Sequence, residues 1–222
     1  MKQIYAPGCA FMLYKPELSK KVFKFLNKNL GNIPEQLICC RNKPKLESGT
    51  QVINACAGCD QRYRELYDNI STISLWEILA ESNTFPFPDY NGIKMSIHDA
   101  CSTRTEERVH SAIRRLLERM NIEIIEPKNT RTKAICCGYS FYDTLSPEQV
   151  NKMIEKRSSE MPCDNVVVYC FSCIKSIHIG RKKPRHIIDL LFGEETMVSI
   201  LESDTWEDKL SEFINSHLSD EK

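Results

Sequence analysis

The sequence has no long hydrophobic run, no excess of charge and no secretory signal. None of its apolar stretches approaches the roughly 20 residues needed to span a bilayer. Lys plus Arg and Asp plus Glu number 30 each, so no overall field favours nucleic acid or an anionic membrane. The opening residues, MKQIYAPGCAF, are too short and too polar for a secretory signal. We therefore expect a cytoplasmic protein with no membrane span and no nucleic-acid partner.

Two common cofactor patterns are also missing. No GxGxxG follows an expected strand, so the sequence carries no flavin or nicotinamide fingerprint. It also has no ferredoxin-type CxxCxxCxxxCP run, and therefore no obvious relay cluster of that kind.

Cysteine is what the sequence has in excess, with eleven among 222 residues. The odd count and the expected reducing compartment argue against a disulfide framework. Hydrophobic residues make up 41% of the chain, enough for a core that needs no covalent staples. Thiols kept in a reducing compartment usually bind metal or take part in redox chemistry.

Ten of the eleven cysteines form a pattern that occurs twice. Each copy has a single cysteine, an adjacent pair, a CxxC motif and then an apolar stretch. The cysteines of the two copies are Cys9, Cys39, Cys40, Cys56 and Cys59, and then Cys101, Cys136, Cys137, Cys170 and Cys173. The closing stretches align Leu75, Ile78 and Leu79 with Ile187, Leu190 and Leu191. Cys163 is left over and is most simply a small buried hydrophobic residue.

Local patterns predict alternating strands and helices. Short β-branched or apolar runs predict strands before four of the motifs, at 3–6, 51–55, 94–98 and 165–169. The two cysteine pairs follow the short apolar segments 37–38 and 134–135 in the same way. Helical periodicity covers 16–31, 106–120 and 146–154, with Ser146 a suitable N-cap. Each CxxC motif is expected to open a helix.

This alternation predicts an α/β fold with two pseudo-symmetric Rossmann-like halves and mainly parallel sheets. Ligands bind at the carboxyl ends of such strands, so we expect the cysteines to converge in the crevice between the halves. We divide the chain into a first half at 1–90, a second half at 91–195 and a helical tail at 196–222. In the tail, Trp206, Leu210, Phe213 and Ile214 fall on one helix face, which predicts a packing or partner-docking helix.

The cysteine pattern resembles the CCG domain family, best known from the cysteine-rich subunit of heterodisulfide reductase. The second copy fits well, with Cys136-Cys137-Gly138 between Cys101 and the CxxC motif. The flanking His98-Asp99-Ala100 and Pro184-Arg185-His186 are also similar to the family. The resemblance covers residues 1 to about 195.

The first copy departs from this pattern in two ways. Arg41 replaces the glycine after the cysteine pair, and only the 15 residues 41–55 separate Cys40 from Cys56. In the second copy the matching interval houses the expected helix at 146–154, and the first has no room for one. We therefore expect a lost crossover helix and a rewired sheet in the first half.

The resemblance implies that each five-cysteine set holds a non-cubane [4Fe-4S] cluster. The chain would then be an iron–sulfur oxidoreductase that reduces a small disulfide, or oxidises thiols, with electrons from a ferredoxin-like or flavin-containing subunit. Reducing a disulfide takes two electrons, which iron–sulfur donors deliver singly, and this favours two clusters. His98 and Lys175 are candidate proton donors because they lie near the motifs in the sequence.

Several alternatives stay open. The chain could be a non-catalytic electron-relay or redox-sensing subunit of another oxidoreductase, or a zinc-stabilised interaction module. A thioredoxin-like CxxC leaves the adjacent cysteine pairs without a role. For single residues, His98 could instead anchor the Cys101 loop, His186 could cap its helix, and Arg41 could offset cluster charge or lie solvated on the surface. The basic run 181–185 is expected to be a solvated loop or, alternatively, a docking patch for an acidic electron carrier.

Overall fold

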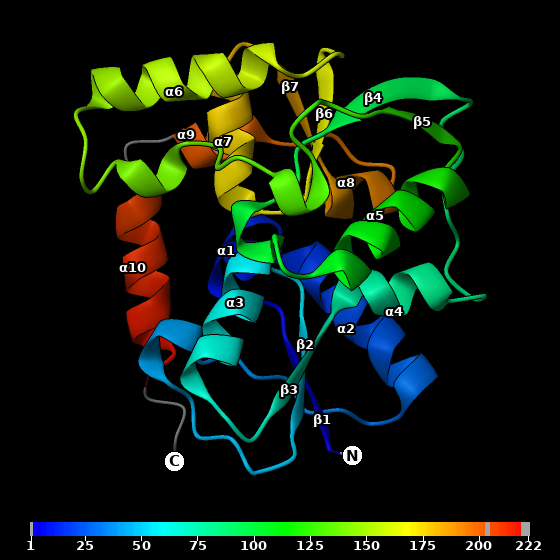
Figure 1. Ribbon diagram of the computed structural model, residues 1–222. Helices are drawn as coiled ribbons and strands as arrows, with labels where there is room; N and C mark the ends of the chain where they lie inside the picture. Colours follow the sequence, from blue (N-terminus) through cyan, green and yellow to red (C-terminus); the bar gives the residue numbers. More distant parts are fainter. Residues whose placement is uncertain (1, 203–204, 219–222) are drawn as a thin grey trace. The chain divides into compact units, whose positions relative to one another are not determined.

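The computed structural model describes residues 2–202 and 205–218 (Figure 1). By its internal contacts the chain divides into two compact units, the first from 1–75 and 202–222 and the second from 76–201. Each unit contains one parallel β-sheet with helices between its strands. The predicted α/β class with two Rossmann-like halves is therefore confirmed.

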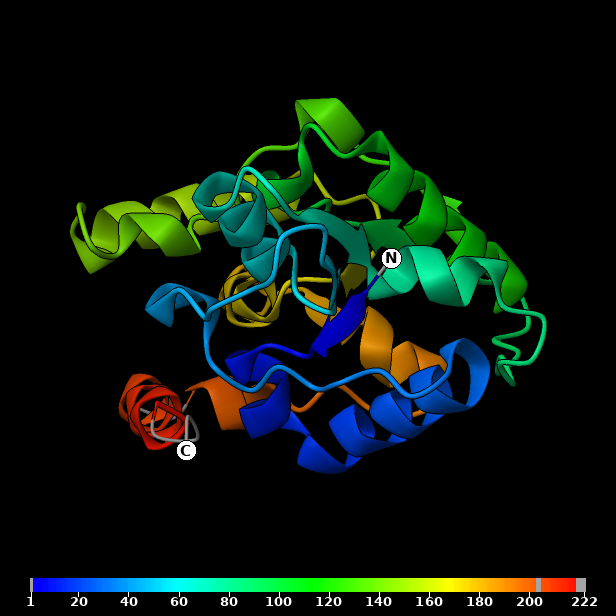
Figure 2. The ribbon, with the colours of Figure 1, turned by 90° about the horizontal axis from the view of Figure 1, so that it is seen from below.

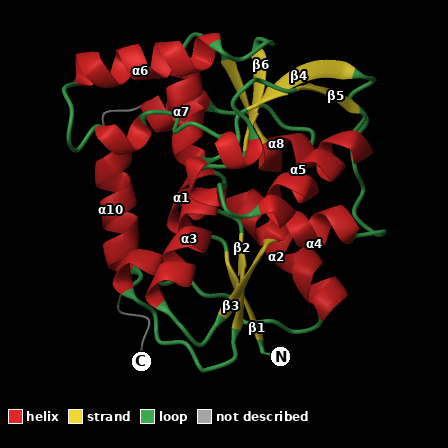
Figure 3. Ribbon diagram, in the orientation of Figure 1, coloured by secondary structure: helices red, strands yellow, loops and turns green. Residues whose placement is uncertain are grey.

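The first unit contains a three-stranded sheet in the order β1-β2-β3, seen as yellow arrows in Figure 3. Its strands are β1 (Gln3–Ala6), β2 (Gln51–Asn54) and β3 (Ser71–Ser74). Its helices are α1 (Cys9–Tyr14), α2 (Pro16–Leu30), the 3-10 turn η1 (Cys40–Asn42) and α3 (Ala57–Leu66). The helix α4 (Leu75–Glu81) follows β3 directly and belongs, from residue 76 onward, to the second unit.

The second unit contains a four-stranded sheet in the order β5-β4-β6-β7. Its strands are β4 (Ile93–Ile97), β5 (Ile122–Ile125), β6 (Asn165–Val168) and β7 (Lys183–His186). Its helices are α5 (Glu107–Arg119), α6 (Pro147–Ser159), α7 (Phe171–Ile179), α8 (Ile187–Leu191) and α9 (Val198–Glu202). Three short 3-10 turns complete it: η2 (Cys101–Thr103), η3 (Arg131–Lys133) and η4 (Tyr139–Phe141).

The two sheets share one strand order. β1, β2 and β3 correspond to β4, β6 and β7, and the place of β5 is taken in the first unit by the segment 34–36. Tyr5 of β1 donates its N–H to the Pro34 carbonyl at 2.9 Å, and Gln36 donates its N–H to the Tyr5 carbonyl at 2.7 Å. This isolated parallel bridge between Tyr5 and Glu35 lies where the second unit has β5.

The expected loss of the crossover helix is confirmed, but the expected rewiring of the sheet is wrong. Residues 43–50 connect η1 to β2 without a helix. Even so, β2 pairs with β1 in parallel, as β6 pairs with β4 in the second unit. The order survives because α2 already supplies a long connection between β1 and β2, which parallel pairing requires.

The predicted helices at 16–31, 106–120 and 146–154 form at α2, α5 and α6. The apolar stripe of α5 packs inward, with Ile113, Leu116 and Leu117 fully buried. α6 begins at Pro147 behind a capping box, in which the Ser146 side chain accepts from the Gln149 N–H and the Gln149 side chain accepts from the Ser146 N–H.

Two local expectations are wrong. The cysteine pairs do not follow strands: Cys39 follows a loop, and Cys136 follows the loop after η3. Segments of two apolar residues, such as 134–135, are too short to specify a strand. The basic run at 181–185 is also not simply a solvated loop, because residues 183–186 form β7, paired with β6. Pro184 is tolerated there because β7 is an edge strand with one neighbour.

The predicted helical tail forms α10 (Trp206–Ser216), which packs against α1 (Figure 2). Trp206, Leu210 and Ile214 are buried and Phe213 is half-buried. The tail is therefore a packing helix of the first unit. Within the described ranges, no helix has both the length and the apolar character needed to cross a membrane.

Candidate metal centres

The five cysteines of the first repeat lie together in the first unit. Cys9 opens α1 after β1, Cys39 and Cys40 lie at η1, Cys56 caps the start of α3, and Cys59 is in its first turn. The Sγ atoms of Cys9 and Cys39 are 3.7 Å apart, and those of Cys40 and Cys59 are 3.6 Å apart. Cys39 also contacts Cys40, and Cys59 contacts Cys56. The side chains form one connected series: Cys9, Cys39, Cys40, Cys59, Cys56.

The five cysteines of the second repeat make the same series in the second unit. Cys101 contacts Cys136, Cys136 contacts Cys137, Cys137 contacts Cys173, and Cys173 contacts Cys170. Corresponding residues therefore meet in the same order in both units, although the first repeat lacks the crossover helix and a full fourth strand. None of the eleven cysteines forms a disulfide.

The strand ends and helix starts explain this convergence. Four of the motifs come directly after β1, β2, β4 and β6, whose carboxyl ends lie at one edge of each parallel sheet. Cys56 and Cys170 are the N-cap residues of α3 and α7. The partial positive charge and free N–H groups of these helix starts favour negative charge on the nearby sulfur atoms.

The first cysteine of each adjacent pair has a lowered pKa. Hydrogen bonds from Cys40 and Cys9 lower the pKa of Cys39 to about 3, against the effect of burial. Hydrogen bonds from Cys101 and Cys137 lower the pKa of Cys136 well below its usual range, with further help from the Ser140 hydroxyl. The neighbours that donate these bonds shift the other way, and the pKa of Cys40 rises to about 12.

The residue after each cysteine pair also stabilises that thiolate. The Gly138 N–H lies 3.4 Å from the Cys136 Sγ, and the backbone N–H and guanidinium charge of Arg41 both lower the pKa of Cys39. The predicted offset of negative charge by Arg41 therefore has a basis in the sulfur–arginine contact, although the Arg41 side chain is largely exposed.

The local structure explains why position 138 needs a glycine and the equivalent position 41 does not. Gly138 has a φ of 101°, and a Cβ there would lie 2.7 Å from Cγ1 of Ile154 on α6. The first unit has no helix corresponding to α6, and Arg41 lies in the 3-10 turn η1. Arg41 has no positive φ and its side chain is exposed, so the reasons for a glycine at 138 do not apply at position 41.

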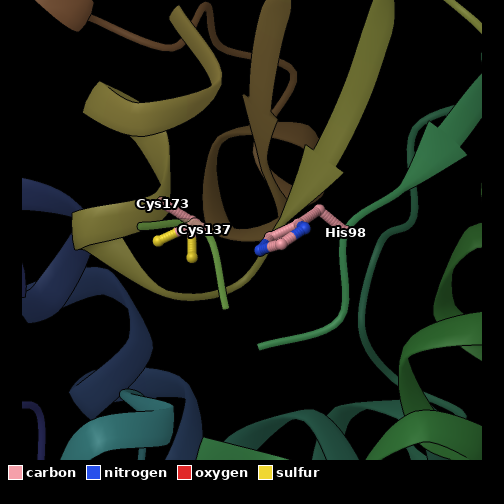
Figure 4. Close-up of side chains that lie close together, drawn as sticks. All are labelled: His98, Cys137 and Cys173. Atoms are coloured by element: carbon pink, nitrogen blue, oxygen red, sulfur yellow. The ribbon is translucent and has the colours of Figure 1, made fainter. Parts of the chain in front are cut away.

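His98 faces the second set from the end of β4. Its Nδ1 accepts a hydrogen bond of 3.2 Å from Arg157 Nε. A ring nitrogen of His98 and the Sγ atoms of Cys137 and Cys173 all lie within 4.8 Å of one another (Figure 4). Nε2 has no hydrogen-bond partner in the part of the chain that the structure describes, and the residue is 1% exposed. Burial, and then the Arg157 charge, lower the pKa of His98 to about 4, so its ring is neutral.

The Cys101 loop is held by Asp99, not by the expected side-chain anchor His98. The Asp99 carboxylate accepts hydrogen bonds from Arg114, Thr130, Tyr169 and the Arg131 N–H at 2.7–2.9 Å. His98 is unsuited to this role because its Nδ1 is already engaged by Arg157. Arg114 and Arg131 were not predicted from the sequence, because only the fold brings them to the Cys101 loop.

The remaining candidates lie outside the two sulfur series. Lys175 is half-buried on α7, and its side chain makes no hydrogen bond or ion pair with any residue in the described ranges. His186 caps α8 as predicted, accepting from the Ile188 N–H at 3.3 Å. Cys163 was expected to be buried and is half-buried, because it lies in the turn before β6, where its N–H donates to Ser96.

The chain matches no protein-family model, and no curated protein matches its sequence. Among solved structures, aspartate racemase from Picrophilus torridus has a TM-score of 0.36 and 11% identity, with 86% of this chain and 91% of that chain covered. Glutamate racemase from Bacillus anthracis has a TM-score of 0.39 and 11% identity, with 95% and 83% covered. These scores are too low to carry a functional argument.

Proposed function

We propose that this chain is an iron–sulfur redox protein that holds two clusters, one in each five-cysteine set. The observation that carries the proposal is the repeated sulfur series, with five thiols meeting in the same order in two units of different local structure. The first set would use Cys9, Cys39, Cys40, Cys56 and Cys59, and the second Cys101, Cys136, Cys137, Cys170 and Cys173.

The donor set fits a thiolate-bound metal. Two thiolates bound to one tetrahedral metal at about 2.3 Å lie about 3.8 Å apart, close to the 3.6 and 3.7 Å between sulfur atoms of the first set, and it is the number of thiols that favours a cluster over a single ion. A [4Fe-4S] cluster usually takes four cysteines. Five thiols per set exceed that number and support the non-cubane geometry implied by the resemblance to the CCG family.

The protein groups around each set would serve an anionic cluster. The N-termini of α3 and α7, the N–H groups after the cysteine pairs and the Ser140 hydroxyl all present positive or donor ends to sulfur. Such donors stabilise negative charge on sulfur and raise the reduction potential of a cluster. Free cysteines throughout the chain support a reducing compartment, and we propose the cytoplasm.

The reaction proposed is reduction of a small disulfide, or the reverse oxidation of thiols, as in the heterodisulfide reductases. Bound clusters would supply electrons one at a time, and two of them match the two electrons that a disulfide takes up. A ferredoxin-like or flavin-containing partner would supply the electrons. The His98 side chain is engaged by Arg157, and the Lys175 ammonium makes no hydrogen bond to a cysteine in the described ranges, so neither is assigned the proton transfer.

Iron and acid-labile sulfide content, measured with EPR on protein purified without oxygen, tests the cofactor. We expect about eight irons per chain, the content of two [4Fe-4S] clusters. Colourless protein that contains zinc and lacks iron would overturn the proposal in favour of a zinc-stabilised interaction module.

A second measurement tests the reaction. Reduced viologen is mixed with the iron-loaded protein and a panel of small disulfides, and oxidation of the dye is followed. We expect oxidation that depends on the disulfide. Iron-loaded protein that exchanges electrons with viologen but reduces no disulfide, alone or with its partner, would instead be an electron-relay or redox-sensing subunit.

A further inference from the structure

We infer that Arg157 locks His98 as an Nε2–H hydrogen-bond donor to the second cysteine set, and that the first set has no counterpart of this donor. The electronic part of the inference rests on the proposed function, because it concerns the reduction potentials of the two clusters. The tautomer of His98 does not depend on any cofactor.

Arg157 is fixed in place by three partners. Its Nε donates to His98 Nδ1 at 3.2 Å, its Nη1 to Glu160 at 2.6 Å and its Nη2 to the Asn129 carbonyl at 2.8 Å. The arginine side chain is 2% exposed. A guanidinium held on three sides in this way cannot turn aside without leaving buried donors unpaired, which is costly.

This arrangement decides which ring nitrogen of His98 carries the proton. Arginine has only donors, so Nδ1 must offer its lone pair to Arg157 Nε. In a neutral imidazole the proton then lies on Nε2. If both ring nitrogens were protonated, the Nδ1–H of His98 would face the Nε–H of Arg157, and the two donors would repel each other. The geometry therefore excludes His98 as a metal ligand, since Nε2 would need a free lone pair to bind a metal.

The Nε2–H of His98 faces one group of possible acceptors. The nitrogen at the far end of the ring points toward the Cys137 and Cys173 sulfur atoms (Figure 4). The residue is 1% exposed, and Nε2 has no hydrogen-bond partner among the described residues. A buried donor is normally satisfied, and a sulfur atom of the second cluster is the acceptor that this position offers.

The first set lacks this donor. Counting three residues back from the first cysteine of each motif gives His98 before Cys101 and Ala6 before Cys9. Ala6 is buried at the end of β1 and has no polar side-chain atom. The two halves therefore share the sulfur series, but only the second has a histidine at this position.

The consequence is a difference in reduction potential. A hydrogen bond to sulfur favours the reduced, more negative cluster, so the second cluster is the easier of the two to reduce with respect to this donor. This donor by itself favours reduction of the second set before the first.

Redox titration followed by EPR on iron-loaded protein tests the electronic claim. In His98→Asn, the amide oxygen can take the place of Nδ1 beside Arg157, and no donor remains at the Nε2 position. We expect the reduction equilibrium of one cluster to fall about tenfold, equivalent to about 59 mV for a one-electron step, with the other cluster unchanged. His98→Gln, whose amide nitrogen can reach the Nε2 position, should recover most of the shift.

His110→Gln is the matched control, because His110 is another buried histidine of the second unit, bonded to Thr103 rather than facing the cysteines. It should shift neither potential. Equal potentials in wild type and His98→Asn at full iron content would overturn the electronic claim and leave the proposed function standing. Absence of iron would instead remove the proposed function.

Nitrogen NMR on histidine-labelled metal-free protein tests the tautomer by itself. We expect the chemical shifts of His98 at neutral pH to report a protonated Nε2 and an unprotonated Nδ1. In Arg157→Met the lock is removed, and the two tautomers should mix. A wild-type His98 with its proton on Nδ1 would overturn the inference whatever metal the protein binds.

Discussion

The guanidinium of Arg114 pairs with the carboxylate of Asp99 through two parallel hydrogen bonds of 2.7 Å each. Asp99 is fully buried and the Arg114 side chain is 11% exposed. Burial alone would raise the pKa of Asp99, but the bonds and charge of Arg114 hold it well below its usual range. This pair connects α5 to the loop that carries Cys101.

Replacing Arg114 by Met leaves the buried carboxylate without its main partner. We expect the free energy of unfolding to fall by about 3–5 kcal/mol at pH 7, the usual cost of breaking a buried ion pair. Urea unfolding measures it. Arg115→Met is the control, because Arg115 pairs with Glu81 on the exposed surface, where such pairs contribute about 1 kcal/mol or less.

The same pair predicts how stability depends on pH. A folded pKa below the unfolded value of about 3.9 gives stabilisation that is present above that pH and is lost as the pH falls. In Arg114→Met the pKa of Asp99 rises. Lowering the pH therefore reduces the free energy of unfolding of the variant less than that of the wild type. The difference in unfolding free energy between wild type and variant should narrow from pH 7 to pH 3. A difference that widens in acid would contradict this account.

Gly138 is expected to tolerate no side chain. Gly138→Ala would place a Cβ 2.7 Å from Ile154 and force an alanine to a φ of 101°, at a cost of about 1–3 kcal/mol. Arg41→Ala, at the equivalent position after the first cysteine pair, should change the free energy of unfolding by about 0.5 kcal/mol or less. Thermal and urea unfolding compare the two variants. Equal costs at the two sites would show that neither the positive φ nor the contact with α6 accounts for the glycine.

The two cysteine sets should load independently. Cys39→Ser and Cys136→Ser each remove one sulfur ligand from the middle of one set, and each should halve the iron content from about eight to about four per chain. The double variant should hold almost none. Cys163 lies outside both sets, so Cys163→Ser should retain the full iron content. Loss of all iron from a single variant would mean that the two sets do not fill separately.

The tail helix should support the first set only. Leu210 is buried where α10 packs on α1, so Leu210→Ala should cost about 2–4 kcal/mol. Since Cys9 opens α1, we expect the first cluster to be lost more readily under chelator while the second is retained. Iron release followed by EPR measures this, with the exposed Glu212→Ala as control. Equal iron release from both sets would show that α10 does not stabilise the first cysteine set in particular.

Much of this architecture could be predicted from the sequence, because the cysteine repeat and the apolar runs before it are local signals. The sets Cys9 to Cys59 and Cys101 to Cys173 follow from spacing and from the common edge of parallel strands. The strands at 71–74 and 183–186 could not be predicted, since STIS and KPRH show little of the apolar pattern of a buried strand. Those strands depend on pairing with β2 and β6.

The polar partners of the site were less predictable for a different reason. Arg157 lies 59 positions from His98 in the sequence, and Arg114 reaches Asp99 only because α5 packs beside the loop. A hydrogen bond between distant side chains leaves no periodic trace in one sequence. The Arg41 substitution was visible, but its meaning depended on the passage of α6 over Gly138.

The bridge between Tyr5 and Glu35 shows how little of a duplicated half is needed to keep its ligands in place. The first unit has one pair of hydrogen bonds where the second has β5 and no helix where the second has α6, yet both units have the same sulfur series. The stretch 43–50 is therefore a natural point for redesign. A helix of the length of α6, or a foreign reporter segment, could be inserted there while the sulfur framework on the strand ends stays intact.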